Sequence, residues 1–131
     1  MDFDFPPDDD PRRLAVREWL AAHPEPTARQ LHDAGYVVPH WPAPHGIGAE
    51  PMHQILIDDE LRRAGVRRPV NPIGIGWAAP TISMAGTDEQ KQRYVDPIFT
   101  GEEFWCQMFS EPDAGSDLAN IGTRAVRDGE E

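Results

Sequence analysis

The chain has 131 residues, which is enough for one domain with a sizeable hydrophobic core. Its 23 acidic side chains outnumber its 12 lysines and arginines, and the formal net charge of −11 excludes nucleic acids and anionic membranes as expected partners. The sequence contains no apolar run of membrane-spanning length and no basic, apolar export signal at its N-terminus. Its single cysteine, Cys106, fits a reducing compartment, so we expect a cytoplasmic protein.

Capping residues and prolines predict two helices near the N-terminus. Three consecutive aspartates precede Pro11, which combines a carboxylate cap with proline at the first helical position, and the apolar spacing continues to about His23. Thr27 and Gln30 have the spacing of a capping box and predict a short second helix, which Gly35 closes.

Two further helical segments are expected in the middle of the chain. The first follows a loop rich in proline and glycine over residues 36–51 and ends at Gly65. The second covers residues 73–85, with a kink or a late start at Pro80. Like Trp19, Trp77 in this second segment is predicted to lie in the core.

The sequence changes from a helical to a strand pattern near residue 101. A capping box that begins at Thr87 predicts a last helix, which reaches about Thr100. The apolar run that follows is predicted to be a strand ending at Pro112, and residues 122–128 to be a second strand. A hairpin signal at residues 128–129 is followed by no returning strand, so we expect the chain to be the N-terminal portion of something longer.

These elements predict a mainly α fold with two parts. An antiparallel helical N-terminal domain is expected over residues 1–103, and the first strands of an incomplete β domain over residues 104–131.

The most informative stretch of the chain runs from Phe104 to Asp117, Phe-Trp-Cys-Gln-Met-Phe-Ser-Glu-Pro-Asp-Ala-Gly-Ser-Asp. A strand that ends in hydroxyl, glycine and acidic residues can present polar groups at the rim of an apolar pocket, which suits a flat heteroaromatic cofactor with a charged tail. Periodicity alone favours a plainer role for Gln107, a hydrogen bond to backbone in a half-exposed strand.

Four stretches in this order give the chain its resemblance to a known family. They are Gly86-Thr87 with Gln90-Lys91 and Arg93-Tyr94; Pro97-Ile98 with Gly101-Glu102; Gln107 to Pro112 with Ala114 to Asp117; and Thr123-Arg124-Ala125 with Asp128-Gly129. The chain resembles the N-terminal part of the acyl-CoA dehydrogenases, flavoenzymes that oxidise acyl-CoA thioesters between the α and β carbons, as in fatty acid β-oxidation. One departure is Asp113, which stands where the family frequently has glycine.

The resemblance implies FAD as cofactor and an acyl-CoA substrate. It assigns flavin contact to Gln107, Met108, Phe109, Ser110, Gly115 and Ser116, and acyl-CoA contact to Ser116 as well. It further implies reoxidation by an electron-transfer flavoprotein and a homo- or hetero-oligomer, usually a dimer of dimers. The catalytic glutamate of the family belongs to a C-terminal helical domain, so no catalytic residue is assigned in this chain and the chain is not expected to be active alone.

Three alternatives remain open. The chain could be a non-catalytic helical partner subunit, an acyl-CoA oxidase, or a nitroalkane-oxidising flavoenzyme with the same early motifs.

Glu111 and Asp117 could form an acid–base pair, but turn or capping roles are favoured. The five histidines, at positions 23, 32, 40, 45 and 53, match no compact ligand spacing, so we expect no metal site.

Overall fold

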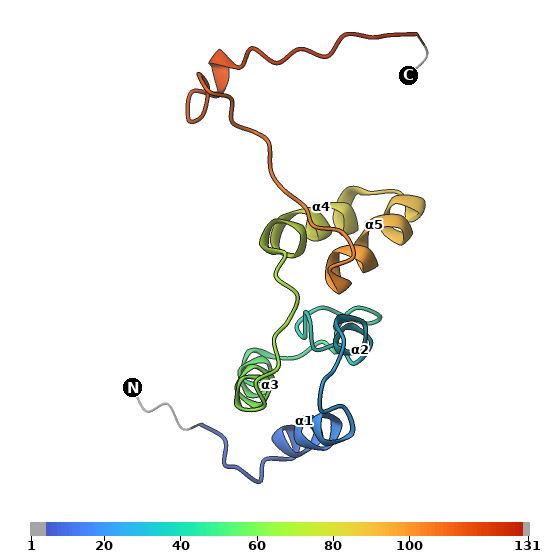
Figure 1. Ribbon diagram of the computed structural model, residues 1–131, viewed down its shortest axis with the longest axis vertical. Helices are drawn as coiled ribbons and strands as arrows, with labels where there is room; N and C mark the ends of the chain where they lie inside the picture. Colours follow the sequence, from blue (N-terminus) through green and yellow to red (C-terminus); the bar gives the residue numbers. More distant parts are fainter. Residues whose placement is uncertain (1–4, 130–131) are drawn as a thin grey trace.

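A computed structural model describes residues 5–129. Two pairs of helices, α1 with α3 and α4 with α5, pack at opposite ends of the helical part, with α2 beside α5 between them (Figure 1). The segment after residue 103 leads away from the helices. The elements are α1 (Pro11–Ala22), α2 (Ala28–Asp33), α3 (Pro51–Arg63), the π-helical turn η1 (Gly74–Ala78), α4 (Ala79–Ala85), α5 (Asp88–Thr100) and the 3₁₀ turn η2 (Leu118–Asn120).

Local sequence signals set the helix ends, as predicted. Thr27 and Thr87 each cap a helix through a complete capping box, in which the threonine hydroxyl accepts from the N3 backbone and the N3 glutamine accepts from the cap backbone. Gly101 follows α5 with a φ of 74°, a left-handed conformation that favours glycine.

The expected late start at Pro80 is confirmed. Pro80 lies in the first turn of α4, and the chain before it forms the π-helical turn η1, in which the backbone N–H of Ala79 donates to the carbonyl of Gly74. Proline has no N–H to continue an ordinary helical ladder, so a regular helix begins only here. The prediction that Trp77 is a core residue is wrong, because its side chain is 57% exposed on this turn.

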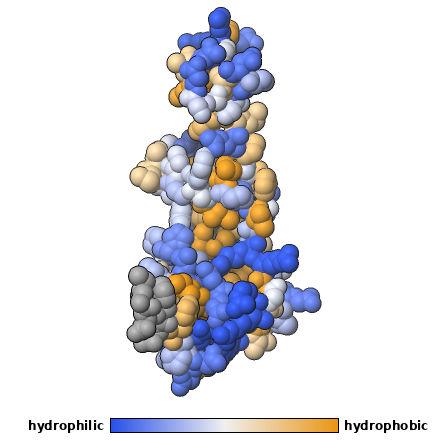
Figure 2. All heavy atoms as spheres, turned by 90° about the vertical axis from the view of Figure 1, so that its left-hand side faces the viewer, coloured by the Kyte–Doolittle hydropathy of each residue, from blue (hydrophilic) through white to orange (hydrophobic). Residues whose placement is uncertain are grey.

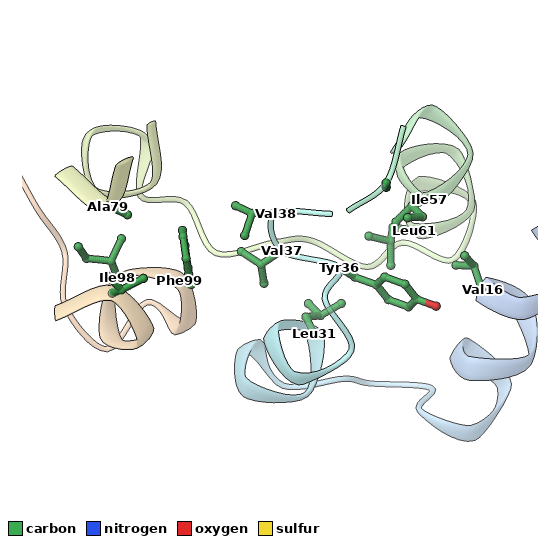
Figure 3. Close-up of a cluster of buried hydrophobic side chains, with 12 residues drawn as sticks. Val16, Leu31, Tyr36, Val37, Val38, Ile57, Leu61, Ala79, Ile98 and Phe99 are labelled. Carbon is green, nitrogen blue, oxygen red and sulfur yellow. The ribbon is translucent and has the colours of Figure 1, made fainter. Parts of the chain in front are cut away.

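The hydrophobic core runs along the helical part and is continuous through the loop between α2 and α3. Val37 and Val38 lie between two groups of side chains, one around Phe99 of α5 and one around Leu61 of α3 (Figure 3). Trp19, which was also predicted to be a core residue, is partly buried against this cluster. The loop over residues 36–49 is therefore held by packing as well as by turns.

A buried ionic network joins α1 to α3. Glu60 is 3% exposed, and its two oxygens accept from Arg13 Nη1 at 2.6 Å and from Arg17 Nε at 2.8 Å. Arg13 also donates to Asp59 at 2.7 Å. Because each buried charge has opposite charges as partners, the desolvation cost is offset.

The two predicted strands, residues 104–111 and 122–128, are absent from the described part of the chain. The only β-type pairing there is an isolated antiparallel bridge between Glu111 and Ala114. A strand needs a partner for its N–H and C=O groups, and neither segment meets one, so both stay extended without a ladder. The helical prediction holds for the first hundred residues, while the β part does not form within residues 5–129.

No helix among the described residues is both long enough and apolar enough to cross a bilayer.

Candidate functional site

The buried side chain of Asn71 fixes the point at which the C-terminal segment leaves the helices. Its amide nitrogen donates to the carbonyls of Ile98, at 3.1 Å, and Glu103, at 2.8 Å. Its amide oxygen accepts from the backbone N–H groups of Gly74, at 3.3 Å, and Trp105, at 3.2 Å. One side chain thus joins the end of α5, the start of η1 and the beginning of the predicted site segment.

Close packing around Asn71 explains the glycine at position 74. A Cβ added to Gly74 would lie 2.4–2.6 Å from the amide atoms of Asn71, far inside van der Waals contact. The absence of a side chain here lets the η1 backbone approach the amide. Sequence reasoning missed Asn71; its only signal was a lone asparagine in a proline-bearing link before a glycine.

Trp105 holds the next part of the segment against α5. Its ring packs edge-on against Tyr94, with centroids 5.6 Å apart, and Arg93 pairs with Glu103 at 2.5 Å. Trp105 and Tyr94 also line a shallow groove together with Thr81, Ile82, Ala85, Gly86 and Gln90. The site segment therefore starts at a fixed place on the α4–α5 pair.

A tight turn then brings the residues before and after Pro112 together. The backbone N–H of Glu111 donates to the carbonyl of Ala114 at 2.7 Å, and the N–H of Ala114 returns a bond of 3.2 Å to Glu111. A Cβ added to Gly115 would lie 4.0 Å from Ser110 Oγ. Two of the predicted flavin contacts, Ser110 and Gly115, are therefore neighbours in space.

The carboxylate of Glu111 has a structural role. It accepts from the backbone N–H groups of Gly122, at 2.8 Å, and Thr123, at 2.7 Å, and from the Thr123 hydroxyl. The Thr123 hydroxyl, followed by these two backbone N–H groups, lowers the pKa of Glu111 below its ordinary value. A carboxylate held in its ionised form by these bonds fits the favoured turn role better than a role as a proton-transferring acid.

All six predicted flavin contacts face solvent in this chain. Gln107, Ser110, Gly115 and Ser116 are exposed, and Met108 and Phe109 are 86% and 71% exposed. Their flavin-binding role remains a prediction, and it requires a further surface to cover them.

The donor set of the segment fits a flavin in chemistry. Gln107 offers an amide with both donor and acceptor, the serines offer hydroxyls, and the backbone around Gly115 is open to close approach. The chain around and before this polar set also exposes apolar side chains, and cofactor sites need apolar walls with few polar groups. The exposed apolar side chains include Trp77, Met84, Phe104, Met108, Phe109, Leu118 and Val126.

A second group of polar side chains lies on the other side of α5, where sequence spacing predicted nothing. His32, His45 and Asp96 come together from α2, the following loop and α5, and their ligand-type atoms all lie within 4.8 Å of one another. Burial lowers the pKa of His45 below its ordinary value, while Asp96 acts in the opposite direction. The three positions are separated by 13 and 51 positions in the sequence, which hid this group from any short motif.

The helical region matches a known protein family. The family described as acyl-CoA dehydrogenase, N-terminal domain, matches residues 11–102. Acyl-CoA dehydrogenase FadE34 of Mycobacterium tuberculosis is 54% identical over 113 residues, which cover 86% of this chain and 16% of that protein. Acyl-CoA dehydrogenase IpdE1 of Mycolicibacterium smegmatis is 40% identical over 98 residues, 74% of this chain and 25% of that protein.

Solved structures show the same likeness. A chain of the ChsE4–ChsE5 complex from Mycobacterium tuberculosis aligns with 98% of this chain at 34% identity and a TM-score of 0.62, using 37% of its own length. A chain of the Tcur3481–Tcur3483 steroid ACAD aligns with 98% of this chain at 29% identity and a TM-score of 0.61, using 38% of its length. The sequence thus spans 16–25% of these two curated relatives and 37–38% of these solved chains.

Proposed function

Because the chain belongs to the acyl-CoA dehydrogenase family, we propose that it supplies the N-terminal helical part of an enzyme that uses FAD to oxidise an acyl-CoA thioester to the α,β-enoyl-CoA. The observation that carries the proposal is the turn at Glu111–Ala114, which places the polar residues on both sides of Pro112 next to one another at the end of an anchored segment.

The site segment binds and orients the cofactor in this proposal. Gln107 pairs its amide with the donor and acceptor edge of the flavin ring, the Ser110 hydroxyl lies at the ring edge, and Ser116 contacts flavin and acyl-CoA. Met108, Phe109 and Gly115 complete this wall. FAD, when bound, supplies the hydride acceptor.

The remaining groups needed for the reaction come from outside these residues in our proposal. Abstraction of the α proton needs a positioned base, whose contribution is about 10²–10⁴-fold, and the one carboxylate fixed in the turn, Glu111, is committed to Gly122 and Thr123. We propose that the base and the opposite wall of the flavin site lie in sequence corresponding to the remainder of the relatives, on this polypeptide or on another.

We also propose partner proteins, a substrate class and a cellular location for this protein. Both solved neighbours described above are named as pairs of proteins, ChsE4 with ChsE5 and Tcur3481 with Tcur3483, and this supports a hetero-oligomer here. The second pair is named a steroid ACAD, which makes a steroid-type acyl-CoA the first substrate to test. An electron-transfer flavoprotein as acceptor and a cytoplasmic location complete the proposal.

Flavin reduction tests this function. The complete product of the gene, purified with any subunit that accompanies it, is mixed anaerobically with acyl-CoA thioesters while flavin absorbance is recorded. We expect bound FAD that bleaches with substrate and is reoxidised by electron-transfer flavoprotein faster than by oxygen; the reverse order of rates would indicate an oxidase. Flavin that no acyl-CoA bleaches would contradict the proposal.

Matched variants test the segment. Gln107→Leu and Ser110→Ala are expected to lower the FAD content of the purified protein, because each removes a hydrogen bond to the ring, worth about 0.5–1.5 kcal/mol. Gln92→Leu on α5 and Ser83→Ala on α4 are the same changes outside the segment and should leave the FAD content unaltered.

A non-catalytic partner subunit is the second candidate, favoured by the exposure of every predicted flavin contact. If the chain only completes the shape of an assembly, then Gln107→Leu and Ser110→Ala will not change FAD content, even though the assembly binds flavin.

A further inference from the structure

Three side chains from separate parts of the chain converge on one face of α5. His32 comes from α2, His45 from the loop between α2 and α3, and Asp96 from α5. Oδ1 of Asp96 lies 3.6 Å from Nε2 of His32 and 3.2 Å from Nδ1 of His45. One carboxylate oxygen thus faces two imidazole nitrogens.

These separations are close to those of a tetrahedral metal site. Zn²⁺ bonds of about 2.0–2.1 Å to nitrogen and oxygen place neighbouring ligand atoms about 3.3 Å apart. Two of the three separations lie within about 0.3 Å of that value, and all three atoms fit within 4.8 Å. The third separation, between the two imidazole nitrogens, is at most 4.8 Å, so one ring must move toward the other when the ion binds.

The two imidazole nitrogens are buried and lack hydrogen-bond partners. His32 is 5% exposed, and neither its Nε2 nor Nδ1 of His45 makes a hydrogen bond with the described residues. Buried polar atoms without a partner are uncommon and need an explanation. A bound cation provides one, since both nitrogens lie within 3.6 Å of the same carboxylate oxygen.

The surroundings of His32 favour its Nε2 as a ligand atom. Its other nitrogen, Nδ1, lies 3.4 Å from Oδ1 of Asp33, and a carboxylate at that nitrogen fixes the tautomer that leaves Nε2 free to bind metal. The ring is stacked on Phe99, with centroids 5.9 Å apart, and Phe99 also contacts the His45 ring at 5.4 Å. Both imidazoles are therefore packed against the same aromatic ring before any ion binds, which limits their orientations.

The nearby cations leave room for an ion. Arg29 approaches the other oxygen of Asp96, with Nη1 3.9 Å from Oδ2, so Oδ1 remains directed at the histidines. Lys91 lines the pocket beside His45 and Asp96, and its ammonium lies 4.0 Å from Asp88. The same pocket opens to solvent and can supply water as a fourth ligand.

We propose that His32, His45 and Asp96 form a structural binding site for one divalent transition-metal ion, with Zn²⁺ as the best match. Two imidazoles and a carboxylate are ligands that Zn²⁺ accepts, whereas Mg²⁺ and Ca²⁺ prefer oxygen ligands alone. The ion would connect α2, the following loop and α5, and so add its binding free energy to the stability of the fold. This inference is independent of the flavin site.

Metal titration of the 131-residue chain tests the site. The untagged protein, freed of metal with a chelator and shown to be folded by circular dichroism, is titrated with ZnCl₂ by calorimetry, and its thermal unfolding is followed with Zn²⁺ or Mg²⁺ present. We expect one Zn²⁺ per chain and an unfolding midpoint that rises with Zn²⁺ and not with Mg²⁺. Co²⁺ should give the visible absorption of a tetrahedral complex.

Variants identify the ligands. His45→Gln and Asp96→Asn should each weaken Zn²⁺ binding by more than about 100-fold, and Asp33→Asn, which alters only the orienting carboxylate, by about 10–100-fold. His40→Gln, at an exposed histidine in the same loop, should bind as the unaltered chain does. Asp33→Asn also serves if a ligand variant does not fold, because Asp33 is largely exposed.

Two results would overturn the proposal. One is a folded chain that takes up no stoichiometric Zn²⁺ and whose unfolding midpoint does not respond to it, which would leave His32, His45 and Asp96 as an ordinary polar cluster. The other is Zn²⁺ binding that His45→Gln, Asp96→Asn and Asp33→Asn all leave intact, which would place the ion elsewhere.

Discussion

A single amide, that of Asn71, determines the direction in which the predicted flavin-binding segment leaves the helices. Its four hydrogen bonds connect α5, η1 and Trp105, and the side chain is 2% exposed. A surface asparagine could be replaced by many polar residues. At this position, only a side chain with both a donor and an acceptor satisfies all four backbone groups.

We therefore predict that Asn71→Ala lowers the free energy of unfolding by about 3 kcal/mol, because buried carbonyl and N–H groups lose their partners. Urea unfolding followed by circular dichroism measures the change. Asn120→Ala is the control, since Asn120 is exposed and its one side-chain bond, to the Asp113 carbonyl, is 3.4 Å long; it should cost less than about 0.5 kcal/mol. Equal losses in the two variants would show that Asn71 is not a structural hub.

At the scale of single elements, α5 depends on its N-terminal cap. The Thr87 hydroxyl accepts from Gln90 N and the Gln90 side chain accepts from Thr87 N, so two otherwise unpaired donors of the helix are satisfied. Because α5 carries Val95, Ile98 and Phe99 into the core, its fraying would loosen the packing of α5 against α2 and α4.

The expected effect of Thr87→Ala is a loss of about 1 kcal/mol in the free energy of unfolding. Thr87→Ser keeps the hydroxyl and should retain most of the stability. Denaturant titration of both variants measures the difference, and a serine variant as unstable as the alanine variant would mean that the methyl group, and not the cap, matters.

The α1–α3 pair should be sensitive to acid. Arg17, followed by Arg13, lowers the pKa of Glu60 below its ordinary value of 4.5, although desolvation acts in the opposite direction. A carboxyl group whose pKa is lower in the folded state contributes stability in full above its unfolded pKa, and this stability is lost as the pH falls through the folded pKa. Unfolding should thus become easier as the pH drops below 4.5.

Glu60→Gln tests this dependence. It leaves Arg13 buried with a weaker partner, so we expect a loss of about 3 kcal/mol near neutral pH and a shallower fall of the urea midpoint under acid conditions. Glu18→Gln, on the exposed side of α1, should keep the original profile. A Glu60→Gln profile parallel to that of the unaltered chain would argue against Glu60 as the source.

Among the elements, the sequence predicted correctly those that depend on interactions between residues close together in the chain. The capping boxes of Thr27 and Thr87 and the late helix start at Pro80 depend on residues within one or two turns, and all three were predicted. The strands after residue 103 depend on partners elsewhere, and no described residue provides one. Likewise, the joining of Asn71 to Trp105 and of His32 to Asp96 depends on packing between distant segments, which local patterns do not contain.

At the scale of the whole molecule, more of the large exposed apolar side chains lie after residue 76 than before it. Apolar residues gather in the middle of the face shown in Figure 2, whereas the part around α1 and α3 is mostly hydrophilic. The largest exposed apolar side chains after residue 76 include Trp77, Met84 and Met108. Apolar exposure of this extent marks an interaction surface, which agrees with the proposed contact to further protein.

The rate at which Cys106 reacts with a maleimide can test that contact. Cys106 is a free, exposed thiol next to Gln107, so a maleimide should label the 131-residue chain as rapidly as its urea-unfolded form. In the complete, flavin-loaded gene product, labelling should slow at least about tenfold because the segment is covered. Equal labelling rates in the 131-residue chain and in the flavin-loaded gene product would mean that the segment stays exposed. Mass spectrometry identifies the labelled residue.

The position of FAD relative to residues 107–116 tests the central claim most directly. A crystal structure of the complete, FAD-loaded gene product should show the Gln107 amide and the Ser110 and Ser116 hydroxyls within about 2.7–3.2 Å of polar atoms of the flavin. A bound flavin that touches none of the three side chains, with the segment still facing water, would contradict the account.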